Sequence, residues 1–242
     1  MDIFFIFGLF VIAYMYASVG HGGASGYLAL MAFYGVAPET MKSSALILNL
    51  FVSLIAFLIF FKSGVFRWRL LLPFIITSVP FAFLGAGLEI SPSLYRKILG
   101  VCLLLATVKI LLPTQIIPPD TSNPNIPVAL IAGGGIGFIS GLIGIGGGII
   151  LSPLLIIAGW ANIKESASIS SAFIFLNSAA GLAGLYNSNA IHVGHSFVIW
   201  ILVALIGGLT GSYFGAYRIT FKWMKYILSM VLVLASFKLF LQ

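Results

Sequence analysis

Two glycine clusters, one in each half of the chain, constrain this sequence more than any other feature. The first reads Val19-Gly20-His21-Gly22-Gly23-Ala24 and the second reads Ile143-Gly144-Ile145-Gly146-Gly147-Gly148, each within apolar sequence. A short apolar segment and then Ser-Ser-Ala follow each cluster, at 43–45 and at 170–172. Glycine clusters interrupt helices, and interrupted apolar segments at matching positions of two halves are typical of secondary transporters that bind their substrate between repeats.

The composition is that of a membrane domain. Of the 242 residues, 61% are hydrophobic and only 7% are charged, whereas soluble domains carry about 25% charged residues. The net charge of +7 comes from scattered lysines and arginines, as in the loops that orient membrane proteins, and not from a basic patch for nucleic acid. We therefore expect a multi-pass protein of the cell (plasma) membrane, in contact with the lipid bilayer and not with nucleic acid.

Five apolar segments lie on either side of a polar linker. The linker at 113–127 holds five prolines, which exclude a continuous helix. We predict an all-α polytopic membrane protein with a single transmembrane domain over 1–242, divided into repeat one at 1–112 and repeat two at 128–242. The segments are 3–19, 24–36, 43–61, 70–88 and 94–112, then 128–143, 148–159, 167–186, 196–214 and 224–241.

The segments at 24–36 and 148–159 are too short to cross a membrane as helices. A helix rises ~1.5 Å per residue and needs about 20 residues to cross a hydrocarbon core of about 30 Å. Each short segment follows a glycine cluster. We therefore predict one glycine-broken or re-entrant element per repeat, in which a helix enters, the glycine loop is unwound, and a half-helix leaves.

The basic residues favour an inverted relation between the two repeats. With five elements per half, eight lysines and arginines fall on one side of the membrane and four on the other. If each glycine-broken pair makes a single crossing, the division is seven to five. The clearer bias favours inverted repeats with both termini outside. The larger group is Lys62, Arg67, Arg69, Lys109, Lys164, Arg218, Lys222 and Lys225, and the smaller is Lys42, Arg96, Lys97 and Lys238.

The two breaks are the predicted anion site. Unwound backbone exposes N–H groups that need a partner at membrane depth. Half-helices that begin near residues 24 and 148 would direct positive dipole ends at the breaks, where serine and asparagine side chains can donate further hydrogen bonds. The predicted substrate-binding residues are Gly20, His21, Gly22, Gly23, Ser25, Ser44, Asn49, Gly144, Gly146, Gly147, Gly148, Ser171 and Asn177.

Each of these residues also has a structural interpretation. Glycine permits close helix packing, and serine and asparagine can bond neighbouring helices. His21 has Ile145 as its counterpart, so the site would be asymmetric; a protonated histidine would attract an anion, but His21 could also line a wet vestibule. The isolated pair Gly207-Gly208 is interpreted as packing, and alanine at Gly207 is expected to leave transport intact because it raises helix propensity.

Other kinds of chemistry are not predicted. No carboxylate stands in the middle of an apolar segment, so the usual proton relay of membrane pumps is not visible. The sequence has no Gly-Lys-Ser/Thr phosphate loop, which argues against ATP as the driving force in this chain. Clusters of His, Asp, Glu or Cys at membrane depth are also missing, and we expect no metal, no cofactor and no enzymatic activity.

An ordered set of stretches resembles the TauE/SafE family of sulfite exporters. Residues 144–148 (Gly-Ile-Gly-Gly-Gly), followed by Pro153-Leu154, are similar to the family pattern Gly-x-Gly-Gly-Gly…Pro-x-Leu. Residues 64–70 (Gly-Val-Phe-Arg-Trp-Arg-Leu) resemble the family's Gly-x-(Val/Ile)-x-Trp-Arg entry to a helix. The first glycine cluster departs from the pattern, since His21 interrupts it and Ala24 replaces a glycine.

The resemblance implies a secondary transporter of a small inorganic or organosulfur anion such as sulfite, thiosulfate or sulfoacetate. Its expected mechanism is alternating access, with one repeat rocking against the other, driven by the substrate gradient or by protons as a coupling ion. The residues alone leave open a passive anion channel, a non-transporting membrane scaffold and an intramembrane enzyme, although the missing catalytic clusters argue against the enzyme. Assembly as a homo-oligomer is also left open.

Overall fold

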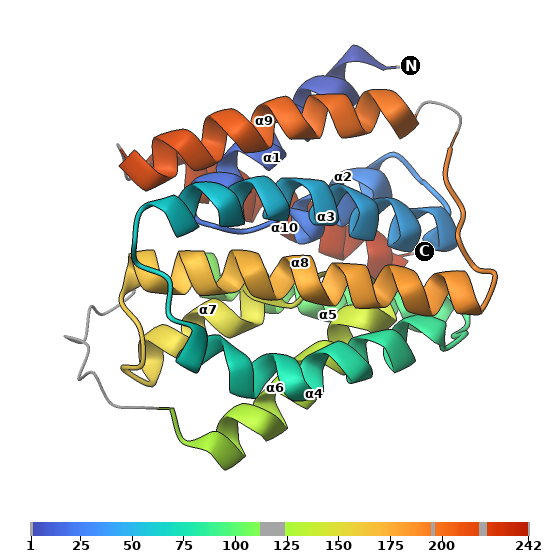
Figure 1. Ribbon diagram of the computed structural model, residues 1–242. Helices are drawn as coiled ribbons and strands as arrows, with labels where there is room; N and C mark the ends of the chain where they lie inside the picture. The colour runs from blue at the N-terminus through green and yellow to red at the C-terminus, as the bar shows by residue number, and fades with distance from the viewer. Residues whose placement is uncertain (1, 112–123, 195–196, 218–221, 242) are drawn as a thin grey trace.

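The computed structural model describes residues 2–111, 124–194, 197–217 and 222–241, and these residues form helices without strands (Figure 1). The all-α fold is confirmed. The first half contains α1 (Ile3–Ser18), α2 (Ala24–Phe33), α3 (Pro38–Lys62), α4 (Trp68–Gly87) and α5 (Pro92–Leu111). The second half contains α6 (Ile126–Ile143), α7 (Gly148–Ile157), α8 (Ile163–Asn187), α9 (Phe197–Tyr217) and α10 (Lys222–Leu241).

Three helices begin before the segments drawn from hydropathy, and two of them, α3 and α8, have polar first turns. α3 begins at Pro38, whose fixed φ suits a first turn, and therefore includes Lys42. α8 begins after Asn162, which forms a capping box with Glu165. α6 begins at Ile126, so the end of the expected linker is helical. The rest of that linker, 112–123, lies outside the described residues.

Among the described residues, five helices are long and apolar enough to cross a membrane: α3, α4, α6, α8 and α9. α1, α2 and α7 are apolar but shorter, with 16, 10 and 10 residues. Large apolar side chains also cover the outside, as at Ile131 and Ile76, which are 77% and 63% exposed. Water would penalise such a surface and lipid does not, which agrees with a membrane domain.

α1 and α2 form a hairpin whose tip is the first glycine cluster. Phe5, near the start of α1, packs edge-on against Tyr34, just after α2, with ring centroids 5.2 Å apart. Between these ends, a Cβ at Gly26 of α2 would overlap Ile12 of α1. The 10 residues of α2 span only about 15 Å, and they lead back to the side on which α1 begins. The predicted re-entrant element is present in the first half.

α6 and α7 form a second hairpin around the second glycine cluster. Phe74 of α4 contacts both arms at the open end: its ring centroid lies 6.3 Å from that of Trp160, just after α7, and its carbonyl would overlap a Cβ at Gly133 of α6. Ala129 of α6 and Leu155 of α7 belong to the same buried apolar cluster. The end of α7 therefore lies beside the first half of α6, as the end of α2 lies beside α1.

α3 and α8 run antiparallel through the centre of the molecule (Figure 1). Ser43, near the start of α3, donates to the carbonyl of Ala190, just after α8, at 3.3 Å. Phe60, near the end of α3, shares a buried cluster with Ala167, near the start of α8. The outer helices are exchanged between the halves, since α9 packs on α1 and α4 packs on α6. Two equivalent repeats are expected to exchange contacts in this way, while their inverted relation and its two-fold axis stay predictions.

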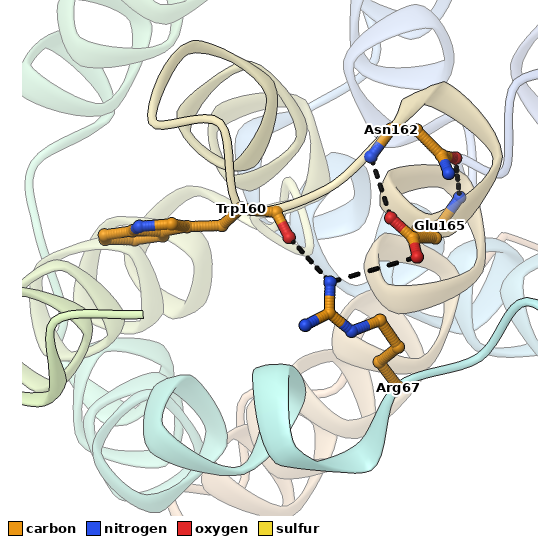
Figure 2. Close-up of polar contacts among 4 residues, drawn as sticks. All are labelled: Arg67, Trp160, Asn162 and Glu165. Carbon is orange, nitrogen blue, oxygen red and sulfur yellow. Dashed lines mark hydrogen bonds and ion pairs between the residues drawn. The ribbon is translucent and has the colours of Figure 1, made fainter. Parts of the chain in front are cut away.

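The helix ends define two ends of the molecule, which we call the amino end, where α1 and α3 begin, and the opposite end, where α3 ends. Arg67 before α4 donates to the carbonyl of Trp160 after α7 at 3.0 Å (Figure 2), so both loops lie at the opposite end. Lys238 of α10 donates to the carbonyl of Phe33, which places the end of α10 at the amino end. Five elements per half require this arrangement, whereas a single crossing per glycine-broken pair would separate Arg67 from Lys164.

Two glycine stripes bring the outer helices into close contact. A Cβ at each of these glycines would lie against backbone atoms of the neighbouring helix, which is the usual function of small residues spaced four apart. At Gly207 a Cβ would come within 2.6 Å of the Phe10 carbonyl oxygen. Gly207 therefore serves packing, as predicted, and alanine fits there only if the neighbouring backbone shifts. Retention of transport by Gly207→Ala stays a prediction. The stripes are Gly207, Gly211 and Gly215 of α9, and Gly133, Gly137 and Gly141 of α6.

Candidate functional site

Both glycine clusters are unwound, as predicted. In the first cluster, φ is 75° at Gly20 and 98° at Gly23; in the second, φ is 83° at Gly144, 78° at Gly146 and 78° at Gly147. Residues other than glycine seldom adopt these φ angles. The helices α2 and α7 begin immediately after these turns, so each break lies at a helix N-terminus.

Asn49, in the middle of α3, connects the two breaks. Its Oδ1 accepts a hydrogen bond from the backbone N–H of Ala24, the first residue of α2, at 3.0 Å. Its Nδ2 donates to the carbonyl of Ile145 in the second break, at 3.1 Å. The side chain is fully buried. One amide group, with a donor and an acceptor, therefore bonds the tips of both hairpins.

A stripe of α8 faces the breaks from the other side. Ser170, Ile174 and Ser178 follow one another at intervals of four residues and therefore share one face of the helix. A Cβ at Gly22 would lie 3.0 Å from Ile174 Cγ2, and a Cβ at Gly146 would lie 2.9 Å from the same atom. The two breaks thus meet between Asn49 and Ile174, each near the midpoint of its long helix.

His21 is buried at the first break and is bonded to the second repeat. Its Nδ1 lies 2.9 Å from the carbonyl oxygen of Val19 and must carry a proton, because a carbonyl can only accept. Its Nε2 lies 2.9 Å from Ser152 Oγ of α7, and that oxygen lies 2.8 Å from Ser170 Oγ of α8. A neutral His21 therefore accepts from Ser152, and a protonated His21 would donate to it. Among the described residues, no three His, Cys, Asp or Glu side chains form a group that could bind a metal.

Two buried hydroxyl groups beside the second break have no hydrogen-bond partner among the described residues. They are Ser140 of α6 and Ser178 of α8. A Cβ at Gly146 would lie 3.2 Å from Ser178 Oγ, and a Cβ at Gly147 would lie 3.5 Å from Ser140 Cβ. Buried polar groups are rarely left without a partner, because each costs free energy of about 1–3 kcal/mol. Both hydroxyls are therefore suited to donate to a ligand at this break.

The space enclosed at the breaks is small. A cavity of about 10 Å³ lies against Tyr16, His21, Ser25, Ile145 and Ile174, among others. This is the volume of about one water. A sulfur oxyanion does not fit there unless the hairpin tips separate, so the structure is closed at the candidate site.

The structure brings most of the predicted site residues to the hairpin tips, but it directs two away. Ser171 Oγ donates to the carbonyl of Ser168 on its own helix at 2.8 Å. Asn177 Nδ2 donates to Ser78 Oγ of α4 at 3.1 Å. Ser44 is buried, and its hydroxyl has no partner among the described residues. The residues at the tips and on their flanks are Gly20, His21, Gly22, Gly23, Ser25, Asn49, Gly144, Gly146, Gly147 and Gly148.

Ser178 of α8 and Ser140 of α6 face the second break but do not follow from a match of the repeats by residue type. That matching selected Ser171 and Asn177 as counterparts of Ser44 and Asn49. Helical periodicity selects instead the face at 170, 174 and 178, because the side chain at 171 is turned about 100° from the one at 170. Periodicity measured from the break also indicates Ser140, one turn before Gly144.

Two unwound breaks held between two long antiparallel helices, and lined by amide and hydroxyl groups, are features expected of an all-helical membrane transporter. The family described as sulfite exporter TauE/SafE matches residues 4–239. The probable membrane transporter protein y4hK of Sinorhizobium fredii (strain NBRC 101917 / NGR234) is 36% identical over 236 residues, which cover 95% of this chain and 94% of that protein. The chain therefore belongs to the TauE/SafE family, as the resemblance implied. No solved structure matches it.

Proposed function

We propose that this protein is a secondary transporter of the cell membrane that moves a small sulfur-containing anion by alternating access. The observation that carries the proposal is the meeting of the two glycine breaks at Asn49, because each break belongs to a different half of the chain. A substrate bound between them would be released to one side when the halves tilt one way and to the other side when they tilt back. The family description names sulfite, and thiosulfate and sulfoacetate are further candidate sulfur anions.

The donors at the second break suit an oxyanion. Gly147 supplies no side-chain cap to α7, and a helix N-terminus carries roughly +0.5 of a charge. The hydroxyls of Ser140 and Ser178 lie beside that N-terminus without a partner among the described residues. Amides and hydroxyls bind an anion without a fixed opposing charge, so the substrate can also leave, as transport requires.

The closed contacts favour a transporter over a passive channel. With a cavity of about 10 Å³ at the breaks, passage requires that the tips move. The bonds between Asn49 and Ile145 and between His21 and Ser152 join opposing halves, and tilting would have to break them. A channel would keep a continuous path instead, and a membrane scaffold would need neither path nor donors.

Protons are the proposed coupling ion, and His21 is the proposed acceptor. Protonation would reverse the hydrogen bond to Ser152, and the hydroxyls of Ser152 and Ser170 would reorient in turn. The titratable neighbour on α1 is Tyr16, whose ring centroid lies 6.5 Å away and whose Oη is bonded to Ser25. A positive charge on His21 would attract the anion and reduce the net charge that crosses the membrane.

Flux into proteoliposomes tests this function. Purified protein should catalyse saturable uptake and exchange of sulfite, thiosulfate or sulfoacetate without ATP, with chloride and acetate as control anions. Missing flux of all three sulfur anions under every ion gradient would contradict the substrate class. A current that stays proportional to voltage, without counterflow, would identify a channel, and a protein inert toward every anion would favour a scaffold.

A further inference from the structure

Lys42 is a buried cation that rests against the second glycine break. Its exposed fraction is only 8%, although hydropathy places it in a loop at the membrane surface. A Cβ on Gly144 would lie 3.1 Å from the carbonyl oxygen of Lys42 and 3.4 Å from its Cγ. The break therefore packs directly on the backbone and the stem of this lysine, and it helps to exclude solvent from the side chain.

The ammonium group of Lys42 is only partly satisfied. Its Nζ donates to the carbonyl of Ala86, in the last turn of α4, at 2.8 Å. An ammonium has three N–H donors, so two remain. No carboxylate of the described residues forms an ion pair with it, since the ion pair found there joins Arg67 and Glu165 at the opposite end. Glu39, which precedes it by three residues on α3, is exposed.

The charged form of a buried lysine is costly without an opposing charge, and a bound anion would supply one. Ionisable side chains within membrane domains are costly and commonly mark the path of a substrate or an ion. Lys42 lies where α3 packs against Gly144 at the second hairpin tip, and the carbonyl of Ala86 in α4 accepts a hydrogen bond from its ammonium. The first break carries its own ionisable nitrogen in His21, so each break has one group that can hold positive charge.

We propose that Lys42 binds the transported oxyanion: its ammonium contacts the anion while the anion passes the second glycine break at the amino end of the site. This inference rests on the proposed transport function and adds a full positive charge at the second break, whose other donors are amides and hydroxyls. Separation of the α6–α7 tip from α3 uncovers the ammonium and allows the anion to reach it.

A structural alternative is that Lys42 only caps α4, because cations near a helix C-terminus stabilise it. Two variants separate the two functions. Lys42→Gln keeps an N–H donor for the Ala86 carbonyl and removes the charge, whereas Lys42→Arg keeps the charge. Lys62→Gln is the matched control, since Lys62 ends the same helix at the opposite end and is exposed.

The measurement is the Kd for sulfite by thermal shift in detergent, together with uptake by proteoliposomes and gel filtration as a check on folding. Lys42→Gln should bind sulfite about tenfold or more weakly, because the loss of one partner of a buried charge pair is costly. Lys42→Arg should stay within about threefold of the unmodified protein, and Lys62→Gln should not differ. An unchanged Kd in folded Lys42→Gln would overturn the role of Lys42 and leave the transport function standing; absence of sulfur-oxyanion binding by the unmodified protein would overturn both.

A second route applies where Lys42→Gln does not fold. Cysteine is introduced by Lys42→Cys in a Cys102→Ser background. Its thiol is modified either with aminoethyl methanethiosulfonate, which restores an ammonium, or with methyl methanethiosulfonate, which adds a neutral group. The ammonium adduct should recover sulfite binding at least about fivefold over the neutral adduct. Equal binding by the two adducts would overturn the proposal.

Discussion

Arg67 and Glu165 join the two halves of the chain at the opposite end of the molecule (Figure 2). Arg67 Nη1 lies 3.9 Å from Glu165 Oε1 and donates to the carbonyl of Trp160 at 3.0 Å. Asn162 and Glu165 bond each other reciprocally at 2.9 Å in a capping box, which fixes the carboxylate. This arrangement holds the loop before α4 against the loop after α7, beneath the hairpin formed by α6 and α7.

Arg67→Ala should therefore favour opening at this end. The lost carbonyl bond and the partly exposed ion pair together are worth about 1–2 kcal/mol, so the open population should rise roughly tenfold. The measurement is the rate at which an impermeant maleimide labels Ala167→Cys, a buried position beside Gly20, in a Cys102→Ser background. Arg69→Ala, at an exposed neighbour, is the control; equal labelling rates in both variants would show that Arg67 does not restrain this end.

Asn49→Ala should abolish transport and lower the free energy of unfolding by about 1–3 kcal/mol, because the Ala24 N–H and the Ile145 carbonyl lose their buried partner. Asn49→Asp should also lose sulfite binding, since it lacks the donor and adds a negative charge to an anion site. Asn177→Ala is the matched control on α8, because its amide bonds Ser78 instead of a break. Sulfite binding is measured by thermal shift. If the Asn49 and Asn177 variants lose it equally, the bonds of Asn49 to the two breaks are not what binding depends on.

Gly147→Ala should lose sulfite binding. Alanine at φ 78° is strained, and its Cβ would lie 2.8 Å from both Ile136 and Phe173, so the start of α7 must move. Two controls separate the causes. Gly159 has a φ of 69° and open space around it. Gly159→Ala should therefore lower the free energy of unfolding only by the backbone strain, about 1–2 kcal/mol. Gly135→Ala lies within α6 and also meets open space.

Binding of sulfite and the unfolding temperature of the three glycine variants are compared in one detergent. Gly159→Ala should bind normally at a lower unfolding temperature, and Gly135→Ala should match the unmodified protein or exceed its stability. If Gly147→Ala binds sulfite with normal affinity, the amides of the second break do not form the site, and attention moves to His21 and the serines.

The elements of this fold could be predicted from the sequence because apolar length and glycine both act locally. The number of apolar segments, the short helices after each cluster and the positive φ at Gly20 and Gly144 follow from hydropathy and from the conformational freedom of glycine. The first turns of α3 and α8 were missed because their polar residues lower hydropathy, although Pro38 and the Asn162 capping box are sequence features of a helix start.

The pairing of side chains could not be predicted in the same way. Burial of Lys42 depends on Gly144, which is 102 positions away in the sequence, and the link from His21 to Ser152 joins residues 131 positions apart. The restriction on Gly207 comes from the Phe10 carbonyl of another helix. Such contacts depend on how the helices pack against one another, and the spacing of residues along a single helix does not determine that packing.

The inverted relation of the repeats predicts which loops share a face of the membrane. In a Cys102→Ser background, Ser63→Cys and Lys164→Cys should react with an impermeant maleimide from one face, and Ser93→Cys from the other. The first two flank the contact between Arg67 and Trp160, whereas Ser93 lies in the first turn of α5. Reaction of positions 63 and 164 from opposite faces of oriented vesicles would exclude five elements per half.

His21→Gln should uncouple transport from the pH gradient. Glutamine can bond Ser152 but, unlike histidine, cannot take up a proton near neutral pH. Sulfite uptake by His21→Gln should therefore not change when a proton gradient is imposed, whereas the same gradient should accelerate uptake by the unmodified protein. Ser152→Ala should weaken the acceleration, because it interrupts the chain from His21 to Ser170. His192→Gln, at an exposed loop position, is the control and should keep the full response. The measurement is the initial rate of uptake into proteoliposomes with and without an imposed pH gradient at constant internal pH; an undiminished response in His21→Gln would exclude His21 as the coupling group and leave the substrate gradient as the driving force.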